Sequence, residues 1–354
     1  MAADAAVYVP SKQDPAHHRD TLLALWDGSL GEPAHMRAKY DWFYRACPNG
    51  KPLLELLRHE PSGKWVGACA AGRRRMSYQG RNIPAGVLVD LVVEPLHRSL
   101  GPALTMQMSM VEQVHQEFEL LLGFPNPRAA SLFKRIRYDK FRDIVRYVRV
   151  VRHGPYLRRR MPALLAAPCG WLLDAASRVR DALRRRPLRP LRTEWSDRVD
   201  PRMGTLWERS RPRSMLTAWR SLDFLRWRFD DSPLPRARHL LVFGRDAGGA
   251  GDGLVAWFTV VRDGHVLHVR DFWSVDAEAG TPLACIDALL VAARRDGAAA
   301  VSVEMATSAQ RAASWQSRGF VARNARPVFG YWSAPPNVVG ADTDVHLTAV
   351  DEDE

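Results

Sequence analysis

Residues 87–104 read VLVDLVVEPLHRSLGPAL, and this stretch decides the class of fold. The apolar run 87–93 predicts a strand, and the run 104–119 after the turn predicts a helix. A strand that leads through a tight turn into a helix exposes backbone N–H groups at the positive end of the helix dipole, which is a ready site for phosphate. Gly101 lets a pyrophosphate approach the backbone closely, and Ala103 keeps the start of the helix narrow.

The composition describes a folded protein without a disulfide or zinc framework. The 354 residues suffice for two domains, and 46% of them are hydrophobic. The four cysteines form no C-x-x-C pair, and the eleven histidines show no H-E-x-x-H spacing, so we expect no metal site. There is no run of 18 uncharged apolar residues and no secretion signal, so we expect a cytoplasmic protein.

The positive charge is concentrated in one segment. Residues 146–192 hold 13 Arg, no Lys and 2 Asp, which is 13 − 2 = +11 of the net +12. Residues 169–186 within this segment are amphipathic, with apolar side chains at helical spacing and arginines elsewhere. Three interpretations fit: a helix packed between domains, a helix on the anionic inner membrane surface, or a docking face for acyl carrier protein. Few aromatic residues are interleaved, so nucleic-acid binding is disfavoured.

Signals of the first half recur in the second. An apolar strand carries one acid in each half, Asp90 and Asp271. From Asp90 to Tyr138 is 48 residues, and from Asp271 to Phe320 is 49. The aromatic–Arg pairs that open the halves, at Tyr44 and Trp227, precede these acids by 46 and 44 residues. Matches in the same order predict a duplicated domain, and alternating strands and helices predict a mixed α/β sheet.

Two motifs carry a resemblance to a known family. The order Arg98-x-x-Gly101-x-Ala103 resembles the acyl-CoA pyrophosphate loop of GNAT acyltransferases. The segment LLGFPN, residues 121–126, resembles the GFPN segment of GNAT-like proteins, several of them associated with bacterial envelope or surface-polysaccharide gene clusters. The tail VHLT, residues 345–348, echoes the WxxT-like ending of such proteins. The whole chain therefore looks like a tandem GNAT acyltransferase.

The resemblance implies three parts. Residues 1–150 would be an acyl-CoA-binding GNAT-like domain, 151–195 an Arg-rich amphipathic linker, and 196–354 a degenerate GNAT-like domain. The second half has no Arg-x-x-Gly-x-Ala loop, and Asp276 and Glu278 stand where they would repel phosphate. We expect this half to help form the acceptor pocket.

The resemblance also implies where acyl-CoA binds. The pyrophosphate would lie on the loop and helix start, the pantetheine arm would pair with the preceding strand, and the acyl arm would be lined by the next helix. The residues concerned are Arg98, Ser99, Leu100, Gly101, Pro102 and Ala103 for the loop, Leu91, Val92 and Val93 for the strand, and Asn126 and Phe133 for the arm.

The implied reaction is direct attack of an amine on the thioester, with one group taking the amine's proton and another protonating the thiolate. Candidates for these roles are Asp90, His97, Tyr138 and Tyr44. Many GNATs have a proton-donating Tyr where this chain has Phe133, and Arg137 replaces the usual Gly, so protonation would come from elsewhere.

The expected function is transfer of an acetyl or longer acyl group from acyl-CoA to an amino sugar, an amino acid or a lipid-linked amine, without a metal. Two alternatives stay open at this stage. One is an acyltransferase that uses acyl carrier protein or works at the membrane through residues 146–192. The other is a GNAT-fold binding protein without activity.

Overall fold

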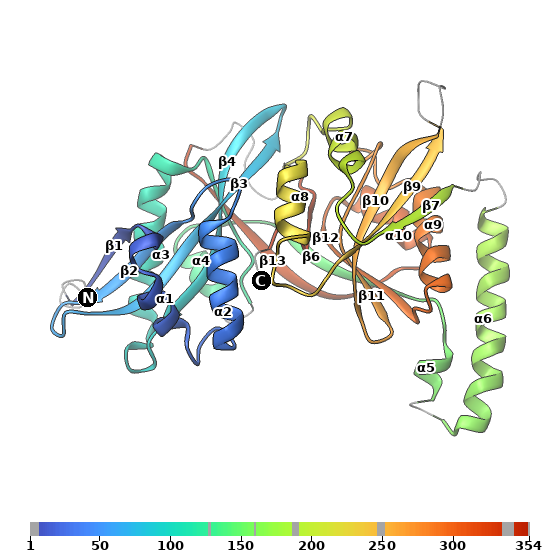
Figure 1. Cartoon of the computed structure of the whole chain (residues 1–354), viewed down its shortest axis with the longest axis horizontal. Coiled ribbons are helices and arrows are strands. Elements are labelled where there is room, and N and C mark those ends of the chain that lie inside the picture. The colour runs from blue at the N-terminus through green and yellow to red at the C-terminus, as the bar shows by residue number, and fades with distance from the viewer. Residues whose placement is uncertain are drawn as a thin grey trace.

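The computed structural model describes residues 7–126, 129–158, 161–185, 191–245, 252–334 and 343–352. One large mixed sheet runs through the molecule in the order β1-β2-β3-β4-β5-β13-β6-β12-β11-β10-β9-β7 (Figure 1). Most neighbouring strands are antiparallel, whereas β4 with β5 and β11 with β12 are parallel. The mixed α/β class predicted from the sequence is confirmed.

The N-terminal part of the sheet is covered by helices on both faces. Its strands are β1 (Tyr8–Gln13), β2 (Leu53–His59), β3 (Lys64–Tyr78), β4 (Arg81–Val93) and β5 (Leu120–Gly123). The helical segments are η1 (Pro15–His17), α1 (Arg19–Trp26), α2 (Pro33–Lys39), the π-helical turn η2 (Tyr40–Arg45), η3 (Pro95–His97), α3 (Leu100–Glu117) and α4 (Ala130–Arg135).

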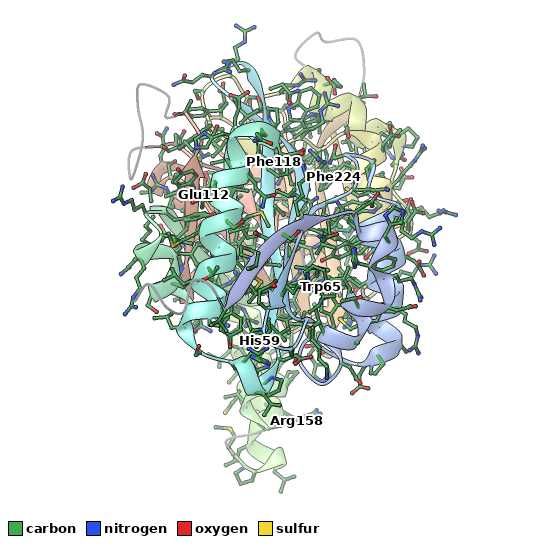
Figure 2. The ribbon with its side chains drawn as sticks, turned by 90° about the vertical axis from the view of Figure 1, so that its left-hand side faces the viewer. His59, Trp65, Glu112, Phe118, Arg158 and Phe224 are labelled. Atoms are coloured by element: carbon green, nitrogen blue, oxygen red, sulfur yellow. The ribbon has the colours of Figure 1, made fainter. Side chains whose placement is uncertain are left out.

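Side chains alternate between the two faces of β2, which explains the layers. Leu54 and Leu56 join the core under α1 and α2, while Leu53 and Leu57 join the core under α3. Figure 2 shows α3, which carries the labelled Glu112, on one side of the sheet edge and α1 and α2 on the other. The two cores of this half are therefore separated by the sheet.

The C-terminal part repeats this order of elements. Its strands are β7 (Arg192–Ser196), β9 (Arg238–Arg245), β10 (Asp252–Asp263), β11 (Val266–Ser274) and β12 (Ala300–Ala306), and its helices are α7 (Pro201–Arg209), α8 (Leu222–Phe229), α9 (Leu283–Arg295) and α10 (Ala309–Ser317). In both parts a parallel strand pair is joined through a long helix and followed by a shorter helix. Two short strands complete the sheet, β8 (Thr217–Ala218) beside β3 and β14 (Leu347–Thr348) beside β12.

The strands that follow α4 and α10 are shared between the two parts. β6 (Asp139–Val150) follows α4 in the chain, yet it pairs with β12 of the C-terminal part. β13 (Val321–Trp332) follows α10, yet it pairs with β5 of the N-terminal part. The two strands also pair with each other at the centre (Figure 1). Each part therefore contains a strand that the other part's chain supplies, and the predicted boundary at residue 150 stays an expectation.

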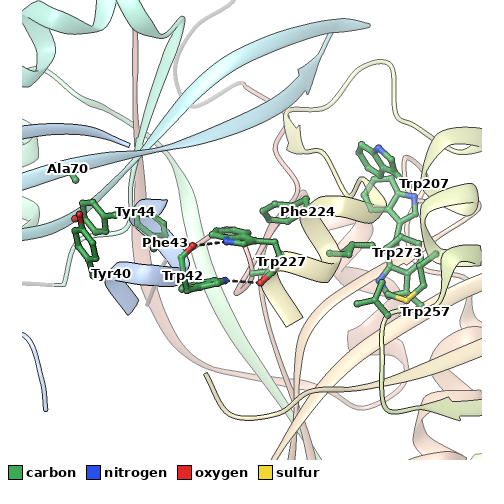
Figure 3. Packing of buried hydrophobic residues seen from close by; sticks show 14 of the residues in the cluster. Tyr40, Trp42, Phe43, Tyr44, Ala70, Trp207, Phe224, Trp227, Trp257 and Trp273 are labelled. Carbon is green, nitrogen blue, oxygen red and sulfur yellow. Dashed lines mark hydrogen bonds between the residues drawn. The ribbon is translucent and has the colours of Figure 1, made fainter. Parts of the chain in front are cut away.

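Two tryptophans join the parts on the face of α1 and α8. The indole N–H of Trp42 donates to the backbone carbonyl oxygen of Trp227 at 2.7 Å. In return, the indole N–H of Trp227 donates to the backbone carbonyl oxygen of Trp42 at 3.0 Å (Figure 3). The rings stack with centroids 4.6 Å apart. The comparison of the two halves in sequence matched Trp227 with Tyr44. In the structure the residue that makes the reciprocal contact with Trp227 is Trp42.

The Arg-rich segment forms α5 (Gly154–Leu157) and α6 (Ala163–Arg185). It does not lie between the two parts: α6 stands at the outer end of the molecule, beside α9 (Figure 1). The packing of this helix between the domains, one of the three interpretations of the sequence, is therefore wrong. None of the described helices is both long and apolar enough to cross a membrane.

Candidate functional site

The turn after β4 leads directly into the start of α3. Ser99 is the N-cap, with an extended backbone at φ −134° and ψ 177°, and its side chain makes no capping hydrogen bond. The first N–H groups of an α-helix have no intrahelical partner, and α3 continues for 18 residues behind them. Pro102 has no N–H to offer, so the donors of this turn come from Leu100, Gly101 and Ala103.

Gly101 has no structural requirement to be glycine. A Cβ built there would meet only Ser99 Oγ, at 3.9 Å, and the residue is not among those with positive φ. The space in front of the helix is therefore open at this position, and any larger side chain would fill it. The predicted loop residues thus lie together at a helix start that admits an anionic group.

Arg98 lies on the same turn but points along the strand. Its guanidinium donates to the carbonyl oxygen of Val93 at 3.2 and 3.3 Å and to Ser29 Oγ at 3.4 Å. The side chain is exposed. The guanidinium therefore rests at the end of β4, beside the N–H groups of the turn rather than in front of them.

β4 and β5 pair over only three residues and then separate. Pairing joins residues 85–87 with residues 120–122, while β4 continues to Val93. Residues 88–91 are only partly buried, although the strand is buried before and after them. Leu91, Val92 and Val93 thus lie on the part of β4 that has no β5 partner.

A β-bulge interrupts this free part of β4. Val92 pairs with Ala68 and Val89 with Ala70, so Asp90 and Leu91 together stand opposite one residue of β3. Asp90 has φ +54°, an unusual conformation that Asp tolerates better than most residues. The bulge redirects the backbone next to the loop.

Two donors hold the carboxylate of Asp90. Lys39 Nζ lies 2.6 Å from Oδ1, and the hydroxyl of Tyr44 donates to Oδ2 at 2.8 Å. All three side chains are buried or nearly so. Burial, and after it the charge of Asp90, holds the pKa of Tyr44 well above its ordinary value. Two of the candidates, Asp90 and Tyr44, are therefore in contact, through an arrangement that fixes the bulge.

His97 belongs to a different cluster. Its Nδ1 lies 3.0 Å from the hydroxyl of Tyr8, and its ring is 4.6 Å from that of His59. This group sits where β1 and β2 meet the loop. Within the described part of the chain no hydrogen bond connects it to Asp90, so the structure does not bring these two candidates together.

Tyr138 and Phe133 lie in the core under α3 and α4. Phe133 packs on Gly123 so closely that a Cβ there would come within 2.1 Å of the ring. Tyr138 meets Phe133 edge to face at 5.1 Å, and its buried hydroxyl has no hydrogen-bond partner among the described residues. Burial raises the pKa of Tyr138 well above its ordinary value. Asn126, at the start of this segment, accepts from Ala129 N at 3.0 Å.

Two charged residues near the bulge, Lys39 and Glu55, were not predicted from the sequence as part of the site. Lys39 is a buried cation directly before the aromatic run YDWFY. Glu55 is a fully buried acid inside the apolar run LLELL, on the strand that pairs with β3 opposite Cys69. Burial raises the pKa of Glu55 from 4.5 to about 7. An isolated charge within an apolar run was the available signal for Glu55, whereas Lys39 lies among other charged residues, which gave no such signal.

The corresponding place in the C-terminal part is filled by the chain itself. β11 and β12 pair over residues 266–269 and 300–303 and then separate. β14 pairs with the end of β12, and Val350 N donates to the carbonyl oxygen of Arg270 on β11 at 3.1 Å. The C-terminal segment thus lies between these two strands and contacts both.

A buried ion cluster fastens this segment. Arg220, with no exposed surface, lies 3.1 Å from Asp271 and 2.9 Å from Asp351. The hydroxyl of Thr348 donates to Asp271 at 2.8 Å. Asp271, which matches Asp90 in the sequence comparison of the two halves, therefore binds the C-terminal segment. Burial raises the pKa of Asp271 above its ordinary value.

A cationic pocket of about 500 Å³ opens beside the C-terminal segment. Arg228, Arg262, Arg270 and His268 line it, together with Asp263 and apolar residues. Burial, followed by the nearby arginines, lowers the pKa of His268. Arg228 also lies over the Trp42 ring at 5.3 Å, so this pocket adjoins the junction between the two parts.

Comparisons with known proteins agree with this architecture. No family model matches the sequence, and no curated protein is recognisably similar to it in sequence. Among solved structures, a probable N-acyltransferase of unknown function from Enterococcus faecalis superposes with a TM-score of 0.63 at 7% identity, over 92% of this chain and 73% of that one.

Two further structures cover the chain as fully. A GCN5-related N-acetyltransferase from Anabaena variabilis gives a TM-score of 0.62 at 12% identity, over 92% of this chain and 73% of that one. Yeast N-myristoyltransferase with bound myristoyl-CoA gives 0.52 at 10% identity, over 92% and 83%. At such low identity the likeness concerns the fold, and the chain has the fold of GNAT-type acyltransferases.

Proposed function

We propose that this protein is an acyl-CoA-dependent N-acyltransferase with one acyl-CoA site, in its N-terminal part. The observation that carries the proposal is the sequence of three features along β4: an unpaired strand edge, a bulge at Asp90, and an open helix start at Gly101. The GNAT-type fold of the chain supports the same reaction class.

The three features suit three parts of acyl-CoA. The N–H groups at the start of α3 would bind the pyrophosphate, and the free edge at Leu91, Val92 and Val93 would pair with the pantetheine amides. The bulge turns backbone N–H groups out of the sheet, where they can polarise the thioester carbonyl. Asp90, held by Lys39 and Tyr44, acts in this proposal as a positioning residue that keeps the bulge in shape.

Tyr138 is the proposed proton donor to the departing thiolate. Its hydroxyl is buried without a partner beside Phe133, and its raised pKa keeps it protonated. Phe133, the side chain at the usual donor position, has no proton to give. The attacking neutral amine must also lose one proton from its nitrogen as the amide forms. A base or a water chain would take this proton, and His97 stays a candidate for the base.

The acceptor in this proposal is an amine that also carries a negative charge. The pocket lined by Arg228, Arg262 and Arg270 suits a carboxylate or phosphate, because guanidinium groups bind both with paired hydrogen bonds. Amino acids, amino-sugar phosphates and amines linked to lipid through phosphate share this chemistry.

Calorimetry with acetyl-CoA and longer acyl-CoA thioesters tests the donor. We expect binding to the full-length protein, followed by release of free thiol when an anionic amine is added. Amines without an anionic group should react more slowly. Absence of CoA binding would reject the proposal in favour of a GNAT-fold protein that is not an acyl-CoA enzyme.

A further inference from the structure

Helix α6 has its polar side towards the protein and its apolar side towards solvent. Among the residues of α6 whose burial is described, four are buried, Ala166, Gly170, Ser177 and Asp181, at the spacing of one helix face. No large apolar side chain is among them. A helix that docks on a protein core normally buries its apolar stripe, so this helix is inverted.

The opposite face is an exposed apolar stripe. Of the twelve large apolar side chains exposed in the described part of the chain, seven lie on α6. Trp171 is 66% exposed, Leu172 59% and Val179 60%. The residues of the stripe, at helical spacing over the length of α6, are Leu164, Leu165, Trp171, Leu172, Val179 and Leu183.

Buried polar contacts fix this orientation. Asp181 lies 2.6 Å from Arg149 on β6 and 2.5 Å from Arg294 on α9. At the middle of the helix, Asp174 accepts from the backbone N of His153 at 2.8 Å and lies 2.7 Å from its Nδ1. Rotating the helix to bury the stripe would break both sets of contacts. The apolar stripe is therefore held facing outward.

Arginines flank the stripe. Arg178 and Arg180 are exposed on α6, and residues 146–192 carry a net +11 by sequence. An exposed apolar stripe with a basic border is the pattern of a helix that lies in a lipid–water interface. We propose that α6 docks on an anionic membrane surface, with the stripe among the acyl chains and the arginines at the phosphate groups.

The charge argues against a second copy of this chain on the same face. The exposed arginines of α6, Arg178, Arg180 and Arg184, would face the same residues of the second copy across such an interface, and like charges repel. An acidic protein would match the arginines but would need an apolar groove as long as α6. A lipid surface supplies both the apolar layer and the negative charge. It also leaves the acyl-transfer site free, because α6 stands at the outer end of the molecule (Figure 1).

Co-sedimentation of the full-length protein with vesicles tests the proposal. Vesicles of equal parts phosphatidylglycerol and phosphatidylcholine should bind the protein at low salt and release it at high salt. Vesicles of phosphatidylcholine alone should bind far less. The Trp171 contribution to fluorescence, obtained by difference from Trp171→Phe, should shift to the blue on binding.

Matched variants distinguish binding through the apolar stripe of α6 from nonspecific binding by other exposed apolar side chains. Leu172→Glu with Val179→Glu should weaken vesicle binding at least tenfold, while Val9→Glu with Val321→Glu, at similarly exposed apolar positions on strands, should leave it unchanged. Arg178→Ser with Arg180→Ser should weaken it roughly thirtyfold on anionic vesicles, at about 1 kcal/mol for each arginine.

Three results would overturn the proposal. The first is no vesicle binding at low salt, and the second is equal binding by the variant with two glutamates on α6. The third is a protein that sediments as a dimer without lipid and becomes monomeric in that variant, because a second copy would then cover the stripe. Acyl-CoA binding by calorimetry should be the same in all variants, so failure here is distinct from failure of the proposed enzyme.

Discussion

Lys39 and Asp90 form an ion pair of 2.6 Å that ties the end of α2 to the bulge of β4. The two side chains are 10% and 5% exposed, so neither charge is well solvated. Their contact connects a helix on one face of the sheet to the strand edge where we propose that the thioester lies.

Lys39→Met should destabilise the protein by about 3–5 kcal/mol, because it leaves a buried carboxylate without its cation. Adding Asp90→Asn to this variant should recover part of the loss, since the remaining group is neutral and still accepts from Tyr44. Urea unfolding measures both changes. A loss below about 1 kcal/mol in Lys39→Met would show that the pair does not hold the bulge.

Gly101→Ala should weaken acyl-CoA binding, and Gly101→Glu should abolish it, with little change in stability. The site is open in the protein alone, so only a ligand close to the backbone would meet the new atoms. Gly154→Ala is a matched control at another open position, because a Cβ there has no neighbour within 4 Å. Calorimetry for binding and thermal unfolding for stability decide the outcome. Unchanged affinity in Gly101→Glu would mean that the pyrophosphate binds elsewhere.

Titration should give one acyl-CoA per chain. The place between β11 and β12 is taken by residues 347–350, and the cluster of Arg220, Asp271 and Asp351 holds them there. Native mass spectrometry measures the stoichiometry directly. Two bound molecules, or a single one that persists in Gly101→Glu, would contradict an N-terminal site.

Stability should fall as the pH rises from about 4.5 to about 7 because of Glu55. Below this window the carboxyl group is protonated in both states. Within it the unfolded chain ionises while burial raises the pKa of the folded group and retains its proton. Above about pH 7 the loss is complete, at most about 3 kcal/mol.

Glu55→Gln should remove this part of the pH dependence. Glu60→Gln, at an exposed position just beyond the same strand, should not. Urea unfolding at several pH values compares the three proteins. Parallel stability curves for the wild type and Glu55→Gln would show that Glu55 titrates normally in the folded protein.

The sequence alone determined the local elements. The apolar run, turn and helical run of residues 87–104 became β4, η3 and the start of α3, and the periodic residues 169–186 fell largely within α6. Such features depend on neighbouring residues, whose spacing sets the strand or helix and whose turn chemistry ends it. The open space at Gly101, in front of the start of α3, is also a local feature, because it depends on a single strand–turn–helix unit.

Tertiary structure decided what the spacing did not encode. The chain crosses over so that β6 reaches β12 and β13 reaches β5, and the C-terminal segment enters the gap between β11 and β12. The ion pairs of Asp181 decided which face of α6 looks outward, against the usual preference for burying apolar side chains. Long-range pairing and buried charge depend on partners that lie far along the chain, such as Arg294, 113 residues from Asp181, and local periodicity carries no information about them.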